Sequence, residues 1–155
     1  MTRARVIVLA LLAVIVLAVA ACGTGAQGIG PSPASQALQT QNVPVEGGGS
    51  YTDVDAAGRA STLETEDFLF INVHIPYEGE IEGTDLFVPY DEIDLNLNRL
   101  PTDKGAKLVV YCRTGGMSAI AARTLVQLGY TDVWNLDGGM IAWKDAGYTL
   151  VDTGR

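Results

Sequence analysis

The stretch "VVYCRTGGMSA", from Val109 to Ala119, says most about the fold class of this chain. It opens with apolar residues that do not alternate with polar ones, as in a strand of a parallel sheet with both faces covered. Cys112 ends this run, and a turn with two glycines leads from it into a helix predicted over residues 117–128. Ligands of open α/β sheets bind beyond the carboxyl ends of the strands, so Cys112 lies where a reactive group is expected.

Segments typical of strands and of helices alternate on both sides of this stretch. A helix is predicted from Val54 to Glu66, with Asp53 or Asp55 as its N-cap residue. Strands are predicted within "FLFINVHI" (68–75), "LFVPYDEI" (86–93), "KLVVYC" (107–112), "DVWNL" (132–136) and "YTLV" (148–151), and a further helix within "GGMIAWKDAG" (138–147). Strands that alternate with helices, joined by right-handed crossovers, predict an α/β fold, a three-layer α/β/α domain around a central parallel sheet.

The loop after Cys112 suits a group that carries negative charge. Gly115 and Gly116 can adopt positive φ angles, which lets successive backbone N–H groups converge on an anion. The N-terminus of the following helix adds partial positive charge at the same place. A thiol held there is favoured as the thiolate, which is the nucleophilic form. Cys112 is therefore the candidate catalytic residue, and the candidate substrate-binding residues follow it: Arg113, Thr114, Gly115, Gly116, Met117 and Ser118.

A second pattern lies downstream of the cysteine loop, in "LDGGMIAWKDAG". Its spacing, "L.GG..AW...G", is formed by Leu136, Gly138, Gly139, Ala142, Trp143 and Gly147. Together with the loop and with "FLFINVH" and "FVPYDEI", this pattern makes residues 54–151 resemble a rhodanese homology domain. The resemblance implies that Cys112 takes a sulfane sulfur from a small donor such as thiosulfate, a polysulfide or a persulfide. It further implies that the resulting persulfide passes the sulfur to a thiol or to cyanide, and no cofactor is expected.

Three positions depart from the family pattern. Met117 stands where active members often carry Arg or Lys. Because thiosulfate is a dianion, its turnover is expected to suffer unless Arg113 meets the donor at the rim of the loop. Asn72 stands where an acid is common, and His74 where an arginine is common. Ser118 follows Met117, so the final arginine of the phosphatase relatives is missing too, and phosphatase activity is not expected because a phosphate would lose its bidentate contacts.

Other functions are compatible with the same residues. The domain can be a binding or sensing module that holds a partner or small anion without turnover, or a redox protein whose Cys112 forms mixed disulfides. A Cys–His pair with His74 would give an acyl-transfer nucleophile, but a strand-end histidine with a local hydrogen bond is the simpler interpretation. One histidine and one domain thiol are too few ligands for zinc. The acidic residues between 78 and 85 are expected to form a solvated loop and no calcium site.

The N-terminus carries features of an export signal. Arg3 and Arg5 precede an apolar run from Val6 to Ala21, and Cys22 follows a small-residue site. A basic start, an apolar core and a small-residue cleavage site predict a secretory signal. The sequence "LAVAAC" resembles a bacterial lipobox, whose cysteine becomes the lipidated first residue of a lipoprotein.

These features predict three parts: a lipoprotein signal peptide over residues 1–21, a lipidated Cys22 with a flexible tether over 22–50, and a domain over 51–155. The tether is rich in Gly, Pro, Ser and Gln, so it cannot bury enough apolar surface to offset the entropy of ordering it. The domain would then lie outside the cytoplasm, anchored to an envelope membrane through the lipid on Cys22. The alternatives are an uncleaved anchor and an ordinary secretory signal.

The charge balance argues against one class of partner. The chain has 10 Lys and Arg against 18 Asp and Glu, a net charge of −8, and removal of the two leader arginines would make it −10. Nucleic acid requires a basic face, so no nucleic-acid partner is expected. If Cys22 is lipidated, Cys112 has no cysteine partner in the chain, which marks it as a reactive thiol.

Overall fold

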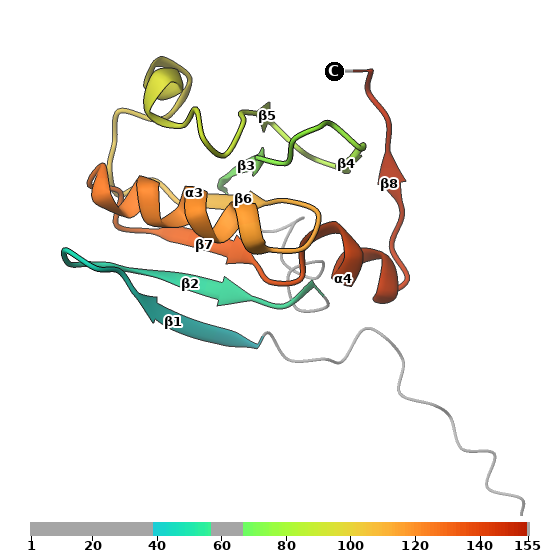
Figure 1. Ribbon diagram of the computed structural model, residues 1–155, viewed down its shortest axis with the longest axis horizontal. Coiled ribbons are helices and arrows are strands. Elements are labelled where there is room, and N and C mark those ends of the chain that lie inside the picture. Colours follow the sequence, from blue (N-terminus) through green and yellow to red (C-terminus); the bar gives the residue numbers. More distant parts are fainter. Residues whose placement is uncertain (1–38, 57–66, 155) are drawn as a thin grey trace, which may run out of the picture. The chain divides into compact units, whose positions relative to one another are not determined.

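The computed structural model describes residues 39–56 and 67–154, which form a six-stranded sheet with helices packed against it (Figure 1). The strand order is β1-β2-β7-β6-β3-β5, and all neighbours are parallel except β1 and β2. The strands are β1 (Thr40–Pro44), β2 (Ser50–Val54), β3 (Leu69–Asn72), β5 (Leu86–Phe87), β6 (Leu108–Tyr111) and β7 (Val133–Leu136). The parallel strands confirm the predicted fold class, with an antiparallel edge strand added.

The remaining elements lie around this sheet. A second, two-stranded sheet pairs β4 (Glu80–Ile81) with β8 (Leu150–Val151) in antiparallel orientation. The helices are the 3-10 helix η2 (Asp94–Arg99) and the α-helices α3 (Gly116–Gln127) and α4 (Gly139–Asp145). The strand predicted in "YTLV" is therefore present, but it pairs with β4 and does not extend the main sheet.

The side chains of β6 alternate between two hydrophobic cores. Leu108 and Val110 belong to the core that includes the buried residues of α3, whereas Val109 and Tyr111 belong to the core that includes Met140 of α4. The four strand residues are fully buried, and each buried Val or Leu side chain contributes roughly 1.5–3 kcal/mol. Because both faces of the strand are covered, its sequence shows no polar alternation, and the three-layer prediction is confirmed.

Helix α3 closely follows its sequence prediction. The side chains that it buries against the sheet recur at one-face spacing: Ala121, Ala122, Leu125 and Val126. After Gln127, Gly129 adopts a φ of 92° and its N–H donates to the Val126 carbonyl oxygen, which ends the helix. Gly147, with a φ of 94°, follows α4 in the same way.

The predicted boundary between tether and domain is wrong. Residues 40–44 form β1, which pairs with β2 in the register Val43 to Tyr51. The turn between the two strands uses Gly47, Gly48 and Gly49, all with positive φ, and Val45 is buried beside it. An edge strand buries little of its own surface and tolerates Pro44, so its composition resembles that of a tether.

The first predicted helix is also corrected in part. Asp53 lies within β2 and is not an N-cap residue; its Oδ1 accepts a hydrogen bond of 2.7 Å from Asn135 Nδ2 in β7. Val54 also lies in β2, whereas residues 57–66 of that predicted helix, the signal peptide and Cys22 lie outside the described residues. Within residues 39–56 and 67–154, no helix is both long and apolar enough to cross a bilayer.

Candidate active site

Cys112 lies directly after β6, where the predicted loop begins (Figure 1). Its side chain is 1% exposed, and its Sγ accepts a hydrogen bond of 3.1 Å from the Gly115 N–H. The Ser118 hydroxyl oxygen lies 3.5 Å from Sγ and 3.1 Å from the Gly115 carbonyl oxygen, so its single proton can serve only one of them at a time. An anionic sulfur at this position would therefore have one backbone donor and one hydroxyl donor within reach.

Gly115 gives the loop its shape. Its φ is 90°, in the left-handed region that side chains rarely adopt, and a Cβ there would lie 3.0 Å from the Gly138 nitrogen. In this conformation Gly115 is the N-cap residue of α3 and directs its N–H to the sulfur of Cys112. Gly116 begins α3 without a positive φ, so the predicted glycine conformation holds for one of the two positions.

The N-terminal end of α4 fixes the loop from the other side. The N–H groups of Met140 and Ile141 donate to the carbonyl oxygens of Cys112 and Arg113, at 2.9 and 3.0 Å. Gly139 lies so close to the loop that a Cβ on it would collide with the Cys112 carbonyl oxygen. Gly139 of the downstream pattern is therefore a steric requirement of the cysteine loop, a backbone relationship that the sequence analysis did not find.

The remaining predicted site residues fall into two groups. Arg113, Thr114 and Gly116 are exposed. Met117 is half-buried and packs against the core beneath α3, while Ser118 is fully buried. Met117 thus places an apolar side chain in the first turn of α3, directly after the cysteine loop.

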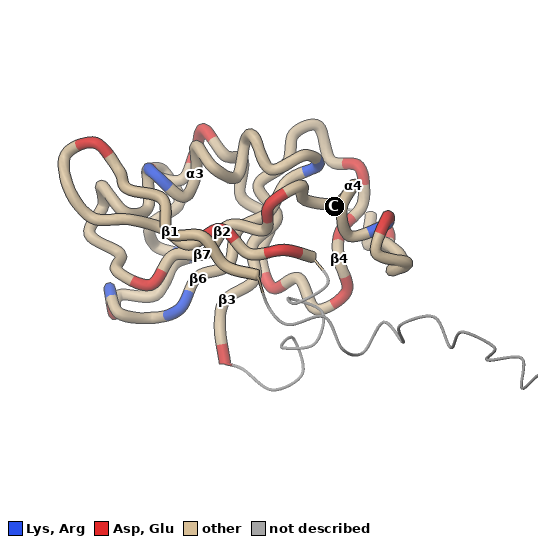
Figure 2. Tube along the Cα trace, turned by 90° about the horizontal axis from the view of Figure 1, so that it is seen from below, with Lys and Arg blue, Asp and Glu red and all other residues tan. Residues whose placement is uncertain are grey.

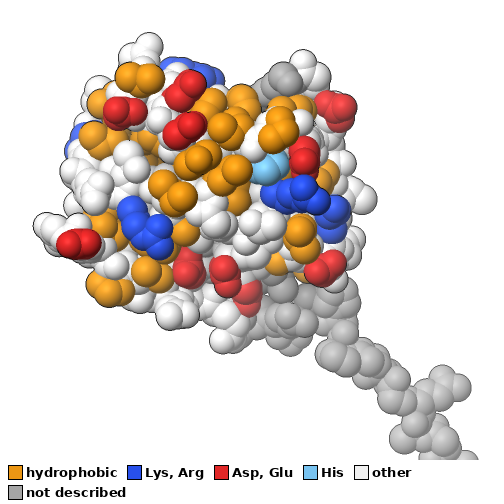
Figure 3. Space-filling view, in the orientation of Figure 1, with side chains coloured by type: hydrophobic (Ala, Val, Ile, Leu, Met, Phe, Trp, Pro, Cys, Tyr) orange, Lys and Arg blue, Asp and Glu red, His pale blue; other side chains and the backbone are white. Residues whose placement is uncertain are grey.

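Glu78, Arg113 and His74 meet beside the cysteine loop. Glu78 Oε1 lies 3.4 Å from Arg113 Nη1, and Glu78 Oε2 lies 3.6 Å from His74 Nε2. Figure 3 shows the histidine, in pale blue, on the surface beside a basic and an acidic side chain. The Arg113 side chain is 54% exposed at the rim of the loop, and it also lies beside the Glu78 carboxylate. An exposed pair of this kind stabilises a fold by about 1 kcal/mol or less.

His74 only partly matches its prediction. It is 6% exposed, and its backbone N–H donates to Asn72 Oδ1 at 3.0 Å. Neither ring nitrogen makes a hydrogen bond within the described part of the chain. The local hydrogen bond therefore involves the backbone, and no described hydrogen bond links the imidazole to Cys112 for acyl transfer.

The acidic segment is only in part the solvated loop that the sequence suggested, since Glu78, Glu82 and Asp85 are exposed. Glu80 is 2% exposed within β4, and Asp85 Oδ2 accepts a hydrogen bond of 2.8 Å from the Phe70 N–H. Both residues are therefore part of the fold. Among the residues that the structure describes, no group of three or more His, Cys, Asp or Glu side chains is placed to hold a metal ion.

Tyr111 connects this segment to β6. Its hydroxyl accepts a hydrogen bond of 3.0 Å from the Ile81 N–H and lies 2.6 Å from Thr84 Oγ1. Burial raises the pKa of Tyr111 well above its ordinary value, and the hydrogen bonds with Thr84 and Ile81 lower it by less. The side chain is therefore neutral and serves as a structural hydrogen-bonding group.

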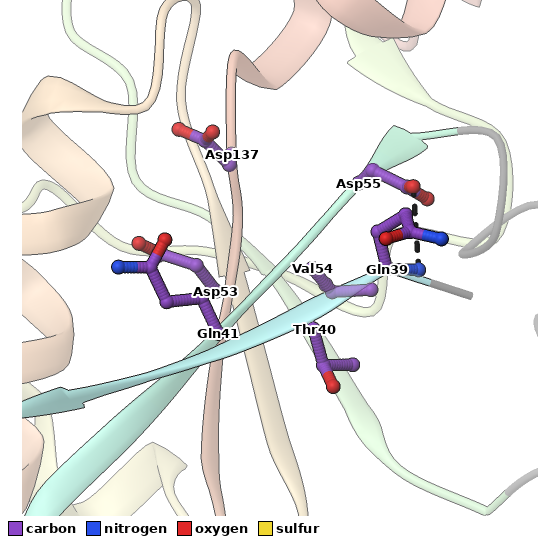
Figure 4. Close-up of a pocket in the computed structure, with 7 residues that line it drawn as sticks. All are labelled: Gln39, Thr40, Gln41, Asp53, Val54, Asp55 and Asp137. Atoms are coloured by element: carbon purple, nitrogen blue, oxygen red, sulfur yellow. Dashed lines mark hydrogen bonds between the residues drawn. The ribbon is translucent and has the colours of Figure 1, made fainter.

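A second cleft, with a volume of about 230 Å³, lies at the ends of β2 and β7 (Figure 4). Its lining carries three carboxylates, from Asp53, Asp55 and Asp137. Burial raises the pKa of Asp53, the hydrogen bond from Asn135 lowers it, and the charge of Asp137 raises it further. Asp137 Oδ1 also accepts the Gly138 N–H at 3.0 Å, which ties this cleft to the start of α4.

Comparison with known proteins supports a single family. The model of the Rhodanese-like domain family matches residues 68–146. The chain is 35% identical over 103 residues to a sulfurtransferase of Allochromatium vinosum, a match that covers 64% of this chain and 94% of that protein. It is 40% identical over 53 residues to the thiosulfate sulfurtransferase GlpE of Pseudomonas paraeruginosa, covering 34% of this chain and 48% of that relative.

Solved structures agree with this assignment. A rhodanese-related protein of Thermoplasma volcanium aligns with a TM-score of 0.55 at 27% identity, over 64% of this chain and 96% of that one. A rhodanese-like domain protein of Staphylococcus aureus gives a TM-score of 0.54 at 27% identity, over 64% and 98% of the two chains. With a matched family model, a parallel sheet and a cysteine loop at its carboxyl edge, the chain belongs to the rhodanese-like domain family.

Proposed function

We propose that this chain carries sulfane sulfur on Cys112 as an envelope-anchored sulfurtransferase. Its family and its sulfurtransferase relatives support sulfur transfer in general terms. The observation that carries the assignment to Cys112 is the buried Sγ that accepts the Gly115 N–H and faces the Ser118 hydroxyl. Such donors can stabilise the negative charge that sulfur carries during the transfer.

The first step is attack of the Cys112 thiolate on the sulfane sulfur of the donor. With thiosulfate, a sulfur–sulfur bond forms at Sγ, the donor's own sulfur–sulfur bond breaks, and sulfite leaves with that electron pair. With a protonated alkyl persulfide, the same bond forms at Sγ, the donor's sulfur–sulfur bond breaks, and the alkyl thiolate leaves and takes up the proton of the new persulfide. In both cases Cys112 becomes a persulfide whose charge the Gly115 N–H and the Ser118 hydroxyl stabilise.

The second step returns the enzyme to its thiolate. Cyanide or an acceptor thiolate attacks the outer sulfur of the persulfide, the bond to Sγ breaks, and Sγ recovers the electron pair. The outer sulfur extends beyond a side chain that is itself only 1% exposed, so it is the atom offered to the acceptor. The Gly115 N–H is already in place and needs no reorganisation during either step.

Turnover of thiosulfate or an alkyl persulfide with cyanide tests this proposal through the thiocyanate that forms. The full-length chain should produce thiocyanate, and Cys112→Ser should produce none above the uncatalysed rate. Thiocyanate formation by both proteins at equal rates would show that Cys112 is not the carrier.

A catalytically weak binding module is the second candidate, because one observation favours it. Met117 is half-buried against the core beneath α3 and supplies no cation for an anionic substrate. Such a domain would hold an anion or a partner at the loop without moving sulfur. A chain that binds thiosulfate, fails to gain sulfur from any donor and retains a reduced thiol would support this candidate.

Anchoring at the envelope is a separate part of the proposal. Its support is the sequence of Arg3, Arg5, the apolar run and Cys22 at a small-residue site. In a bacterial host, the full-length protein should fractionate with membranes, and Cys22→Ala should abolish lipid attachment. Equal recovery of both proteins in the cytoplasmic fraction would contradict this location.

A further inference from the structure

Residues 112–118 contain a single cationic side chain, that of Arg113. Its guanidinium is exposed at the rim, and its Nη1 lies 3.4 Å from Glu78 Oε1. Two carboxylates also lie near the loop: Glu78, whose Oε2 lies 3.6 Å from His74 Nε2, and Asp137, whose Oδ1 would lie 3.5 Å from a Cβ on Gly115. The cation of this loop is therefore already beside a carboxylate.

Buried hydrogen bonds hold the Glu78 segment beside the loop. Asn72 spans this turn with its side chain: Nδ2 donates to the Gly79 carbonyl oxygen at 3.1 Å, and Oδ1 accepts the His74 N–H at 3.0 Å. The Val73 N–H donates to the Tyr111 carbonyl oxygen at 2.9 Å, which fixes the start of the turn against the end of β6. The fold therefore fixes the backbone around Glu78 next to the cysteine loop, within reach of Arg113.

The electrostatic consequence depends on the charge of the donor. Attack on thiosulfate brings a thiolate against a dianion, so this reaction needs positive charge at the mouth of the site. The acidic residues are spread along the chain and the basic ones are few (Figure 2). A donor with one negative charge or none needs only the Gly115 N–H and the partial charge at the N-terminus of α3.

We propose that Glu78 selects against dianionic sulfur donors by occupying Arg113. The inference rests on the proposed sulfur transfer at Cys112 and names the donor class of that site: persulfides with at most one negative charge are preferred to thiosulfate. Glu78 acts through Arg113 and is a specificity-determining residue without contact to the reacting sulfur. Apolar Met117 is consistent with the same donor class, because it too supplies no charge for a dianion.

The test compares two donors, thiosulfate and ethyl persulfide, with the full-length chain and Glu78→Gln. Removal of the carboxylate charge beside Arg113 should raise kcat/KM for thiosulfate by up to about fivefold, mainly through a lower KM. The value for ethyl persulfide should change less than about twofold, and the gain with thiosulfate should shrink as salt is added. Glu82→Gln is the matched control, since Glu82 is an exposed acid of the same segment, and it should alter neither donor.

The same substitution in an Arg113→Gln variant distinguishes two effects of Glu78: pairing with Arg113 and direct repulsion of the donor. In Arg113→Gln, the added Glu78→Gln substitution should give no gain with thiosulfate, because the cation that it would release is absent. A gain that persists in this background, or an equal gain with both donors, would overturn the role assigned to Glu78. If the unmodified chain takes sulfur from neither donor, the proposed function itself fails. If it transfers sulfur but Glu78→Gln and Glu82→Gln have the same kcat/KM for thiosulfate, only the proposed donor selection fails.

Discussion

The carbonyl oxygen of Cys112 accepts a hydrogen bond of 2.9 Å from the N–H of Met140. This bond joins the end of β6 to the start of α4, whose Met140 and Trp143 belong to the hydrophobic core on the face of the sheet away from α3. The neighbouring bond from the Ile141 N–H to the Arg113 carbonyl oxygen continues the same attachment. The position of the candidate nucleophile thus depends on α4 as well as on its own strand and helix.

Gly139→Ala should therefore disrupt the site. Gly139 has a φ of 54°, and a Cβ would meet the Cys112 carbonyl oxygen, so strain and collision should together cost more than about 3 kcal/mol of unfolding free energy. Gly147→Ala is the matched control, because Gly147 has a φ of 94° but no atom within 4 Å of its Cβ position. It should cost only the strain, about 1–2 kcal/mol. Urea unfolding of both variants measures the difference, and equal losses would show that the close approach is unimportant.

Ser118→Ala should slow sulfur transfer with little loss of stability. The Ser118 hydroxyl is the side-chain donor beside Sγ, at 3.5 Å, and a hydrogen bond to a charged group is worth about 1.5–3 kcal/mol. The rate of persulfide formation should fall about tenfold or more. Thr124→Ala removes a hydroxyl from the same helix that bonds to the Ile120 carbonyl oxygen, and it should leave the rate unchanged. Similar rates of persulfide formation in the two variants would show that the Ser118 hydroxyl does not assist the transfer.

Met117→Arg should increase thiosulfate turnover. The side chain begins in the first turn of α3, next to the cysteine loop, and is half-buried. An added cation there would attract a dianion, so kcat/KM should rise about tenfold in low salt. Met117→Leu keeps the apolar character and should show no gain. An arginine variant that binds thiosulfate more tightly without turnover would favour the binding module.

Tyr111→Phe should destabilise the fold by about 1–3 kcal/mol, because the buried Ile81 N–H loses its hydroxyl partner. Burial raises the pKa of Tyr111 in the folded state above its ordinary value of 10.0. Below pH 10 both states keep the phenolic proton, whereas above it only the unfolded state releases it, so this contribution to stability is lost as pH rises.

Urea unfolding at pH 8 and at about pH 11 measures this effect. The stability difference between the unmodified chain and Tyr111→Phe should be smaller at the higher pH, by up to about 1.4 kcal/mol for each unit above 10. Tyr148→Phe, at a half-buried tyrosine that packs on Trp143, is the control and should change little at pH 8. A pH-independent difference would mean that Tyr111 ionises equally in both states.

The sequence predicted the core of the fold and the cysteine loop because their signals are local. The unbroken apolar run of β6 reports double burial, and the glycine after Thr114 reports the positive φ that the turn requires. The attachment of the loop to α4 was not predicted, because backbone hydrogen bonds between distant segments leave no side-chain pattern. Gly139 marks this attachment in the sequence, and it was recognised as part of a family pattern without its steric cause.

Two further features were beyond local interpretation. Strand β1 has mostly polar, exposed residues, so its pairing with β2 is invisible in hydrophobic periodicity. Glu78 meets Arg113 only because the side chain of Asn72 and the Val73 N–H fix the intervening turn. Tertiary hydrogen bonds of this kind decide which charges face the site, and no single segment encodes them.

The intact mass of the full-length chain, before and after exposure to an alkyl persulfide, tests the sulfur-carrier role of Cys112 most directly. We predict a gain of one sulfur atom, its loss on addition of cyanide, and no gain in Cys112→Ala. A smaller fraction of the chain should gain this sulfur from thiosulfate than from the alkyl persulfide. A folded chain with a reduced Cys112 that gains no sulfur from either donor, or a Cys112→Ala variant that gains as much, would contradict the role.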